Sequence, residues 1–331
     1  MSTKSLPLGR FRGAMIGTDI NTAINFLKHG ELVAIPTETV YGLAANAFDE
    51  NAVLKIYHVK NRPQFNPLII HTNSIEKLKS WDLVLPEKML LLAAKYSPGP
   101  LTFVIKKSNT IPDIVTAGTD AVAVRIPNHI LTLELLSKLD FPLAAPSANP
   151  SGFVSPTKAS HVFEQLGDHI PYILDGGECE VGVESTIISF LDETPTILRF
   201  GGLSLESIES IIGKVNSVFS NQNSALPIAP GMLSRHYATK HKLIFDFKET
   251  DFSQYHHDRI GMISYSKNYT SIPISNQMIL SPERKLAEAA RKLFSAMREI
   301  DEKDIDVIFA EKFPDLDLGR AINDRLKRAS V

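Results

Sequence analysis

The 331-residue sequence contains one cysteine and no long apolar segment. The single thiol, Cys179, excludes an internal disulfide bond and a cysteine-rich zinc site, which fits a reducing compartment. No apolar run approaches the roughly 20 residues needed to cross a bilayer, and the N-terminus lacks the apolar stretch of a signal peptide. We therefore expect a cytoplasmic protein without a membrane partner.

The sequence also lacks the motifs of the commonest nucleotide-binding and hydrolytic sites. It has no G-x-x-x-x-G-K-[ST] phosphate loop, no G-x-G-x-x-G after the first expected strand, no H-E-x-x-H and no G-x-S-x-G. No serine or cysteine has an evident histidine and acid partnership, so a nucleophilic triad is not indicated. Chemistry that depends on positioning and charge stabilisation, as in phosphoryl transfer, needs no such triad.

The composition is that of an ordinary globular protein, with 44% hydrophobic residues, 22% charged residues and a net charge of −2. The length suits two domains, each with a core of its own. Because the net charge is close to zero, any contact with nucleic acid would need a local basic patch.

Helix-like and strand-like segments predict an α/β fold in two domains. In residues 1–215 we expect helices near 19–29, 50–59 and 86–96, and strands near 32–35, 68–71, 101–106, 121–125, 143–145, 172–175, 185–190 and 196–199. These elements do not alternate strictly, so the sheet should be of mixed direction. Residues 216–240, rich in polar residues, proline and glycine, predict a linker. In residues 241–331, strands near 243–247, 259–265 and 307–310 and helices near 282–300 and 318–329 predict βαβ units on a small parallel sheet.

Polar residues gather where the expected strands of the first domain end. The cations are Lys60, Arg62, Arg125 and Arg199, and the neutral donors are Thr37, Thr39, Ser147, Asn149 and Ser155. Arginine's planar fork suits phosphate and carboxylate groups, and lysine gives a point charge. Because α/β sheets collect ligands at strand ends, these clusters predict one cleft for a polyanion and a small polar molecule.

Each of these residues also has a simpler structural explanation when it is considered alone. Lys60 and Arg62 could be solvated charges in a turn, and Arg125 could emerge at a sheet edge. His71 could be a hydrogen-bonded structural histidine, and small polar residues at turns often only shape the turn. The functional interpretation therefore depends on the joint pattern.

Ordered motifs along most of the chain resemble those of one family. They are "AIPTETVYGLAANA", the K-x-R pair Lys60 and Arg62, "NPLIIH", "SPGPLTFVI", "VAVRIP", "PSANPSG", "GVESTII" and "LRFGG". Residues 21–202 are similar to the YrdC-like domain of threonylcarbamoyl-AMP synthases, and "PGMLSRHYA" with "LGRAINDRLKRA" resembles the two-domain long form. The resemblance implies a YrdC-like mixed twisted sheet with flanking helices and a smaller Rossmann-like α/β C-terminal domain.

The same resemblance implies a nucleotidyltransferase that makes threonylcarbamoyl-AMP and pyrophosphate from ATP, bicarbonate and L-threonine. Mg²⁺ would be carried in with ATP, and no metal site built by the protein itself is expected. A partner transferase would then move the threonylcarbamoyl group to the tRNA adenosine next to the anticodon, and this chain could itself contact tRNA.

Site residues follow from the resemblance, position by position. It assigns catalysis to Lys60 and Arg62. The expected ATP-binding residues are Lys60, Arg62, Asn66, Ser147, Asn149, Ser155, Arg199 and Tyr237, the last as part of a linker lid. The expected threonine-binding residues are Thr39, His71, Arg125 and Ser185, with Arg125 on the amino-acid carboxylate. The charged residues of the last helix are assigned to structure and solvent.

Two other functions remain as alternatives. A non-catalytic protein that binds double-stranded RNA or tRNA could use the same cations, although the low net charge and the few aromatic residues near Lys60 argue against it. A carbamoyl-transfer domain of the hydrogenase-maturation type resembles this fold, but the acylphosphatase and zinc-finger segments attached to such domains are absent from this sequence. Threonine-dependent formation of an adenylate would separate the three functions.

Overall fold

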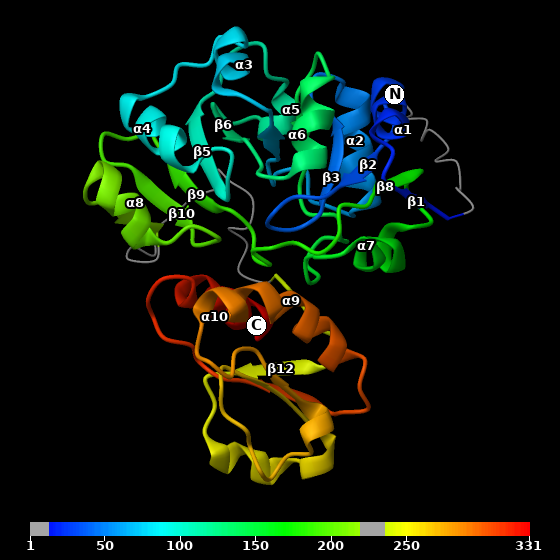
Figure 1. Cartoon of the computed structure of the whole chain (residues 1–331), viewed down its shortest axis with the longest axis vertical. Coiled ribbons are helices and arrows are strands. Elements are labelled where there is room, and N and C mark those ends of the chain that lie inside the picture. The colour runs from blue at the N-terminus through cyan, green and yellow to red at the C-terminus, as the bar shows by residue number, and fades with distance from the viewer. Residues whose placement is uncertain (1–12, 219–235) are drawn as a thin grey trace.

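The computed structural model describes residues 13–218 and 236–331, which form two sheets in succession along the chain (Figure 1). The larger sheet has eleven strands in the order β1-β8-β2-β3-β7-β4-β6-β5-β9-β10-β11. They are β1 (Met15–Gly17), β2 (Val33–Ile35), β3 (Gly42–Asn46), β4 (Ile69–His71), β5 (Leu101–Lys106), β6 (Ala121–Arg125), β7 (Leu143–Ala144), β8 (Tyr172–Leu174), β9 (Thr186–Ser189), β10 (Thr196–Arg199) and β11 (Asn216–Ser217). Parallel pairs such as β4 with β6 occur beside antiparallel pairs such as β5 with β6, which confirms the expected mixed direction.

Eight helices of the described chain connect and flank these strands. They are α1 (Ile20–Lys28), α2 (Glu50–Val59), α3 (Ile75–Ser80), α4 (Glu87–Tyr96), α5 (Asp113–Thr116), α6 (Ile130–Ser137), α7 (Ala159–Leu166) and α8 (Leu205–Ile212). Side-chain caps set several starts: the Asp19 carboxylate accepts from the amides of Asn21 and Thr22, and Asp49 caps α2 in the same way.

The large sheet is buried on both faces. Along β2, Val33 and Ile35 pack in one apolar cluster with α1 and α6, whereas Ala34 packs in another with α2, α4 and α7. Successive side chains of a strand point to opposite faces, so this alternation places helices on either side of the sheet. The strand ends are then the places where polar side chains can gather without disrupting a core.

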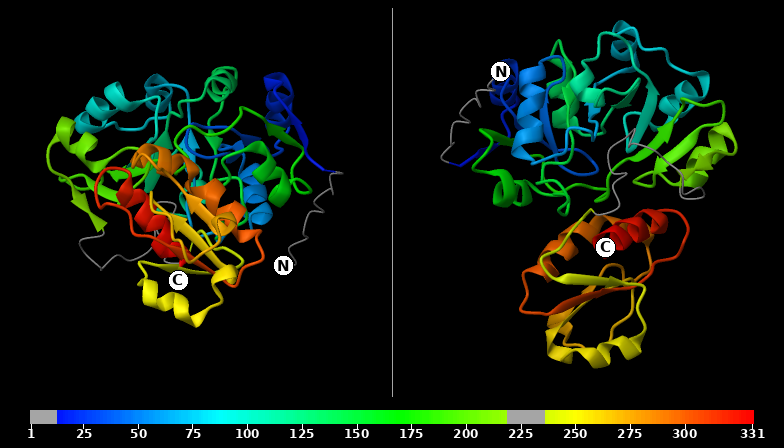
Figure 2. Two further views of the ribbon diagram at one scale, coloured as in Figure 1. Left: turned by 60° about the horizontal axis from the view of Figure 1, so that its bottom comes forward. Right: turned by 180° about the vertical axis from the view of Figure 1, so that it is seen from behind.

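The smaller sheet is fully parallel, as expected, with the order β12-β15-β13-β14. Its strands are β12 (Lys242–Phe245), β13 (Ile260–Ser264), β14 (Gln277–Ile279) and β15 (Val307–Ala310), with the helices α9 (Leu286–Asp301) and α10 (Gly319–Ala329). Figure 1 and the rear view in Figure 2 show α9 and α10 between this sheet and the large one. Three short 3₁₀ helices, Glu249–Gln254, His257–Arg259 and Ile274–Asn276, belong to the same part of the chain.

The two parts share one apolar cluster. Val40 and Val183 from loops of the large-sheet part pack with Leu293 and Phe294 of α9. At Gly182 the approach is closer still, because a Cβ atom there would lie 2.4 Å from the Arg291 backbone, and its φ of +76° also favours glycine. The loop before β9 therefore touches α9 backbone to backbone.

Most of the expected elements are confirmed, often to within one or two residues. The helix expected near residues 282–300 instead begins at Leu286, because Arg284 has a φ of 57° that an α-helix cannot continue through. Strands β1, β3, β11 and β14 and helices α3, α5, α6, α7 and α8 were not expected. The domain boundaries at 215 and 241 stay a prediction, and residues 219–235 of the expected linker lie outside the described chain.

Candidate active site

One pocket lies at the strand ends that face the C-terminal part. Of the residues predicted to form a site, its lining includes Arg62, His71, Arg125, Ser147, Ser185, Arg199 and Tyr237. The lining also includes Thr37, one of the neutral donors expected there, together with Glu184 and His236. Three of the four expected cations, which come from distant segments, therefore meet in one pocket, whereas Lys60 does not line it.

The other predicted residues lie one layer behind this lining and bond to it or to each other. Asn66 accepts hydrogen bonds from Arg62, Thr39 shares one of 2.8 Å with Thr37, and Ser155 donates one of 2.6 Å to Glu184. Lys60 donates to the backbone carbonyls of Ser147 and Asn149. Direct contact of these residues with a ligand stays a prediction.

Arg62 follows the end of α2 and is held by its own loop. Its Nε donates to the Asn66 carbonyl at 3.1 Å, and its Nη2 donates to the Asn66 side chain at 2.6 Å and the Pro67 carbonyl at 2.8 Å. Its Nη1 donates to none of the residues within 13–218 and 236–331. Burial lowers the pKa of Arg62 to about 10, so the side chain stays charged at neutral pH and has one arm left for a ligand.

Lys60 is only 1% exposed and points into the protein. Its Nζ donates to the Ser147 carbonyl at 2.5 Å and also to the Asn149 carbonyl. Burial, together with the charge of Arg62, lowers the pKa of Lys60, whereas the two carbonyl acceptors favour its charged form. Lys60 therefore fixes the loop that presents Ser147 to the pocket.

His71 and Arg125 lie side by side because they are register partners at the ends of the parallel strands β4 and β6. Arg125 is 4% exposed, donates from Nε to the Gly99 carbonyl at 3.3 Å, and forms a 2.7 Å ion pair between Nη2 and Glu38. Burial and the charge of Arg125 lower the pKa of His71 to about 3, so its imidazole is neutral. Glu38, within the quoted "AIPTETVYGLAANA", was not predicted as a site residue.

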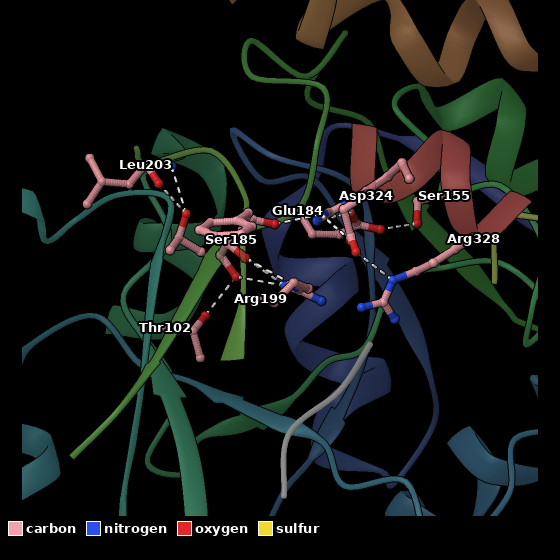
Figure 3. Close-up of polar contacts among 11 residues, drawn as sticks. Thr102, Ser155, Glu184, Ser185, Arg199, Leu203, Asp324 and Arg328 are labelled. Atoms are coloured by element: carbon pink, nitrogen blue, oxygen red, sulfur yellow. Dashed lines mark hydrogen bonds and ion pairs between the residues drawn. The ribbon is translucent and has the colours of Figure 1, made fainter. Parts of the chain in front are cut away.

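Ser185 and Arg199 are joined where β9 begins and β10 ends. Arg199 donates from Nε and Nη2 to the Ser185 carbonyl at 3.1 and 2.8 Å, and from Nη2 to the Ser185 hydroxyl at 3.2 Å. That hydroxyl also lies 2.7 Å from the buried Thr102 hydroxyl (Figure 3). Burial lowers the pKa of Arg199 to about 10, which leaves it protonated at neutral pH.

Tyr237 lies just after the part of the linker that is not described. It is 1% exposed, stacks on Phe294 of α9 at 5.4 Å between ring centroids, and lies under the Arg325 guanidinium at 5.6 Å. Residues 230–235, the first part of the quoted "PGMLSRHYA", lie outside the described residues.

The charged residues of the last helix, which were assigned to structure and solvent, include one buried arginine, Arg325. This residue of α10 is 0% exposed and forms an ion pair of 3.0 Å with Glu184 in the pocket wall. The signal was present in the sequence, since Arg325 follows Ile322 and precedes Leu326 on the apolar stripe of the helix. An arginine at such a position needs a buried partner.

The described residues contain no group of three or more His, Cys, Asp or Glu side chains that could hold a metal ion. Among the described helices, none has the length and apolar character needed to cross a membrane.

Two family models match this sequence. One, described as "Telomere recombination" (Sua5_yciO_yrdC), matches residues 25–201, and the other, described as "Threonylcarbamoyl-AMP synthase, C-terminal domain", matches residues 203–331. The fold and the site thus define a two-part α/β protein with a YrdC-like region.

Similar proteins of known name and structure identify the family within this class. The threonylcarbamoyl-AMP synthase of Pyrococcus abyssi is 42% identical, with 94% of each chain covered. The Bacillus subtilis protein of that name is 40% identical over 94% of this chain and 92% of its own length, and the Schizosaccharomyces pombe one is 37% identical over 98% and 90%. The crystal structure of P. abyssi Sua5 complexed with L-threonine matches with a TM-score of 0.86 at 41% identity, covering 94% of both chains. This chain belongs to the threonylcarbamoyl-AMP synthase family.

Proposed function

We propose that this protein makes threonylcarbamoyl-AMP and pyrophosphate from ATP, bicarbonate and L-threonine, as a nucleotidyltransferase. The observation that carries the proposal is the meeting of Arg62, Arg125 and Arg199 in one buried pocket. Family membership supports it, since the relatives that cover nearly the whole chain bear the name of this activity. The product would supply a transferase that modifies the tRNA adenosine next to the anticodon.

ATP would bind on the side of the pocket formed by Arg62, Ser147 and Arg199. The unused Nη1 of Arg62 can donate to a phosphate oxygen, and the guanidinium of Arg199 adds charge beside it. Lys60 would act mainly by fixing the Ser147 loop, and Asn66 by orienting Arg62. Arg62 would contact the leaving pyrophosphate and stabilise the charge that develops on it, and Lys60 would support this catalysis through the Ser147 loop.

L-Threonine would bind beside His71 and Arg125. The Nη1 of Arg125 donates to none of the described residues, so it can donate to the amino-acid carboxylate. Meanwhile Gly99 holds the Nε and Glu38 holds the Nη2 of the same guanidinium. The neutral imidazole of His71 and the hydroxyl of Ser185 supply short polar contacts for the side chain of the substrate. Thr39 would act through the Thr37 hydroxyl that faces the pocket.

The chemistry would proceed by two bond-forming steps. The neutral amine of threonine adds to bicarbonate with loss of water, or to carbon dioxide with loss of a proton, and gives a carbamate. A carbamate oxygen then attacks the α-phosphorus of ATP, the bond to the β-phosphate oxygen breaks, and pyrophosphate leaves. Arg62 and Arg199 would hold the triphosphate in line for this attack.

Mg²⁺ would enter as the complex with ATP and neutralise charge on the phosphates. The phosphate oxygens can provide its ligands together with water, since Mg²⁺ usually binds through one or two carboxylates plus substrate phosphates. The donor set of the pocket, one carboxylate among arginines and hydroxyls, fits a phosphate-borne ion better than a protein-held one.

The space enclosed by the lining is about 50 Å³, which holds only a few water molecules. A triphosphate and an amino acid need far more room. Binding would therefore require the segment with His236 and Tyr237 to move, as expected for a lid over the nucleotide.

One assay tests the proposal and separates it from simple RNA binding. The protein is incubated with ATP, Mg²⁺, bicarbonate and radiolabelled L-threonine, and labelled adenylate and pyrophosphate are quantified. We expect both products in equal amounts, and neither when L-threonine is replaced by D-threonine. Release of pyrophosphate without threonine, or no release at all, would refute the proposal. RNA binding alone is disfavoured because the pocket arginines are at most 9% exposed. Such buried side chains cannot form a surface groove that contacts successive phosphates of an RNA backbone.

A further inference from the structure

Glu184 is an unusual member of a pocket proposed to hold a triphosphate. Of the described residues in the lining, it alone carries a carboxylate, and it lies in the loop just before β9. A buried anion close to phosphate groups would repel them unless another charge compensates it. The structure provides that compensation from the far end of the chain.

The compensating charge is Arg325 of α10. Its Nε and Nη2 donate to one oxygen of Glu184 at 3.1 and 3.0 Å, and Ser155 donates to the other oxygen at 2.6 Å. Both oxygens of the carboxylate are therefore fixed. Arg325 is 0% exposed and Glu184 7%, so water screens neither charge.

The rest of the α10 cluster holds Arg325 in place. Its Nη1 donates to the Phe200 carbonyl at 2.5 Å and to Asp324 at 3.0 Å, and Asp324 in turn accepts from Arg328 at 2.8 Å. Figure 3 shows Glu184 near Ser155 and Asp324, next to the Arg199 and Ser185 pair. The two carboxylates and two guanidinium groups balance, so the cluster adds no net charge to the pocket.

We propose that Arg325 is a positioning residue of the ATP site: it neutralises and orients Glu184, so that the C-terminal part completes the charge balance of the pocket. This inference rests on the proposed function, because it takes ATP as the ligand. Loss of Arg325 alone would leave an unpaired anion in the wall, and ATP would bind more weakly. Loss of both charges would restore most of the binding.

The groups around Glu184 agree with this role. Burial alone would raise the pKa of Glu184, but the charges of Arg325 and Arg199, the Ser155 hydrogen bond and the nearby His236 lower it to about 2. Without Arg325, burial would act against a weaker opposing charge, and the pKa would rise. Acidification would then protonate Glu184 in the variant and relieve the repulsion of phosphate.

The test compares three variants of the full-length protein. R325M removes the guanidinium while keeping much of the side-chain volume, and E184Q/R325M removes both charges. R320M is the matched control, because Arg320 of the same helix forms an ion pair across the domains with Glu206 at 2.6 Å, away from the pocket lining. Calorimetric titration gives the dissociation constant of MgATP, steady-state assays give KM and kcat, and circular dichroism reports folding.

We expect R325M to weaken ATP binding by about tenfold or more, with a much smaller change in the KM for threonine. E184Q/R325M should lie within about fivefold of the wild type, and R320M within about twofold. From pH 8 to pH 6 the deficit of R325M relative to the wild type should shrink, whereas that of the double variant should not change with pH.

The opposite results would overturn the inference. They are a folded R325M with wild-type ATP affinity, or a double variant as weak as R325M. If R325M does not fold, the ATP affinity of the double variant tests the inference. A double variant that does not fold either would show that the ion pair serves the fold rather than ATP binding. Since ATP binding is measured directly, a wild type that binds ATP but makes no adenylate would refute the proposed function without refuting this role of Arg325.

Discussion

Replacing Arg62 with methionine should separate its structural contacts from its contact with the substrate. The side chain makes three hydrogen bonds within its own loop, to the Asn66 carbonyl, the Asn66 amide oxygen and the Pro67 carbonyl. The remaining arm lines the pocket. The substitution therefore affects stability through the first set of contacts and turnover through the second.

The expected losses in stability and in kcat/KM differ enough to be measured separately. Each of the three hydrogen bonds from the charged guanidinium contributes about 1.5 kcal/mol to stability. Removing the guanidinium also removes the cost of burying its charge, which offsets several kcal/mol of this loss. We expect a net loss of about 1–2 kcal/mol in the free energy of unfolding, or about 2–8 °C in Tm. A unit charge about 4 Å from a phosphate contributes at most about 4 kcal/mol at an effective dielectric constant of about 20, so kcat/KM for ATP should fall by up to roughly 10³-fold.

The assay is pyrophosphate release at varied ATP and saturating threonine, below the melting temperature of the variant. K55M is the matched control, because Lys55 of the preceding helix pairs with Glu31 at the surface, with 31% of its side chain exposed. It should change kcat/KM by less than about twofold. A folded R62M with kcat/KM within about threefold of the wild type would refute the assignment of Arg62 to the phosphates.

Three further predictions concern other buried groups. R125K should raise the KM for threonine by about tenfold while changing the KM for ATP little, since lysine cannot serve Gly99, Glu38 and a substrate carboxylate together; equal changes in both constants would contradict this. His71 keeps a pKa of about 3 in the folded protein against an ordinary 6.5, so the unfolded chain alone takes up its proton as the pH falls from about 6.5 towards 3, and stability declines over that range. Urea unfolding should show that the free energy of unfolding falls between pH 7.5 and pH 5.0 by about 2 kcal/mol less in H71Q than in the wild type. An equal fall in both proteins would count against a neutral His71. Burial raises the pKa of Cys179 to about 12, so iodoacetamide at pH 8 should label it only after unfolding, and rapid labelling of the native protein would show that the thiol is accessible.

The sequence was sufficient to predict most elements where a periodic apolar pattern coincided with a clear start or stop. Helix α2 and strands β5, β6 and β15 have the bounds that their patterns predicted. Strand β3, Gly42–Asn46, was missed because glycine and alanine have little intrinsic preference for strands, and its place between β2 and β7 depends on tertiary pairing.

For the site, the sequence indicated which segments meet but not which atoms they use. Arg62, Arg125 and Arg199 were predicted from residue type and position at strand ends. The bonds behind the pocket lining could not be predicted in this way, because Lys60 bonds to a loop 87 residues further along and Arg325 reaches Glu184 across 141 positions. Local patterns carry no information on such distances until the fold is known.

The contact between Gly182 and Arg291 has a consequence for the order in which the molecule is made. During synthesis the N-terminal part of a chain emerges and folds first. The loop that carries Glu184, however, rests directly on α9, and its carboxylate is fixed by a residue of α10. A nascent chain that ends before residue 325 would already hold every strand of the large sheet and still lack a finished wall for its substrate, so activity should begin only after nearly the whole message has been translated.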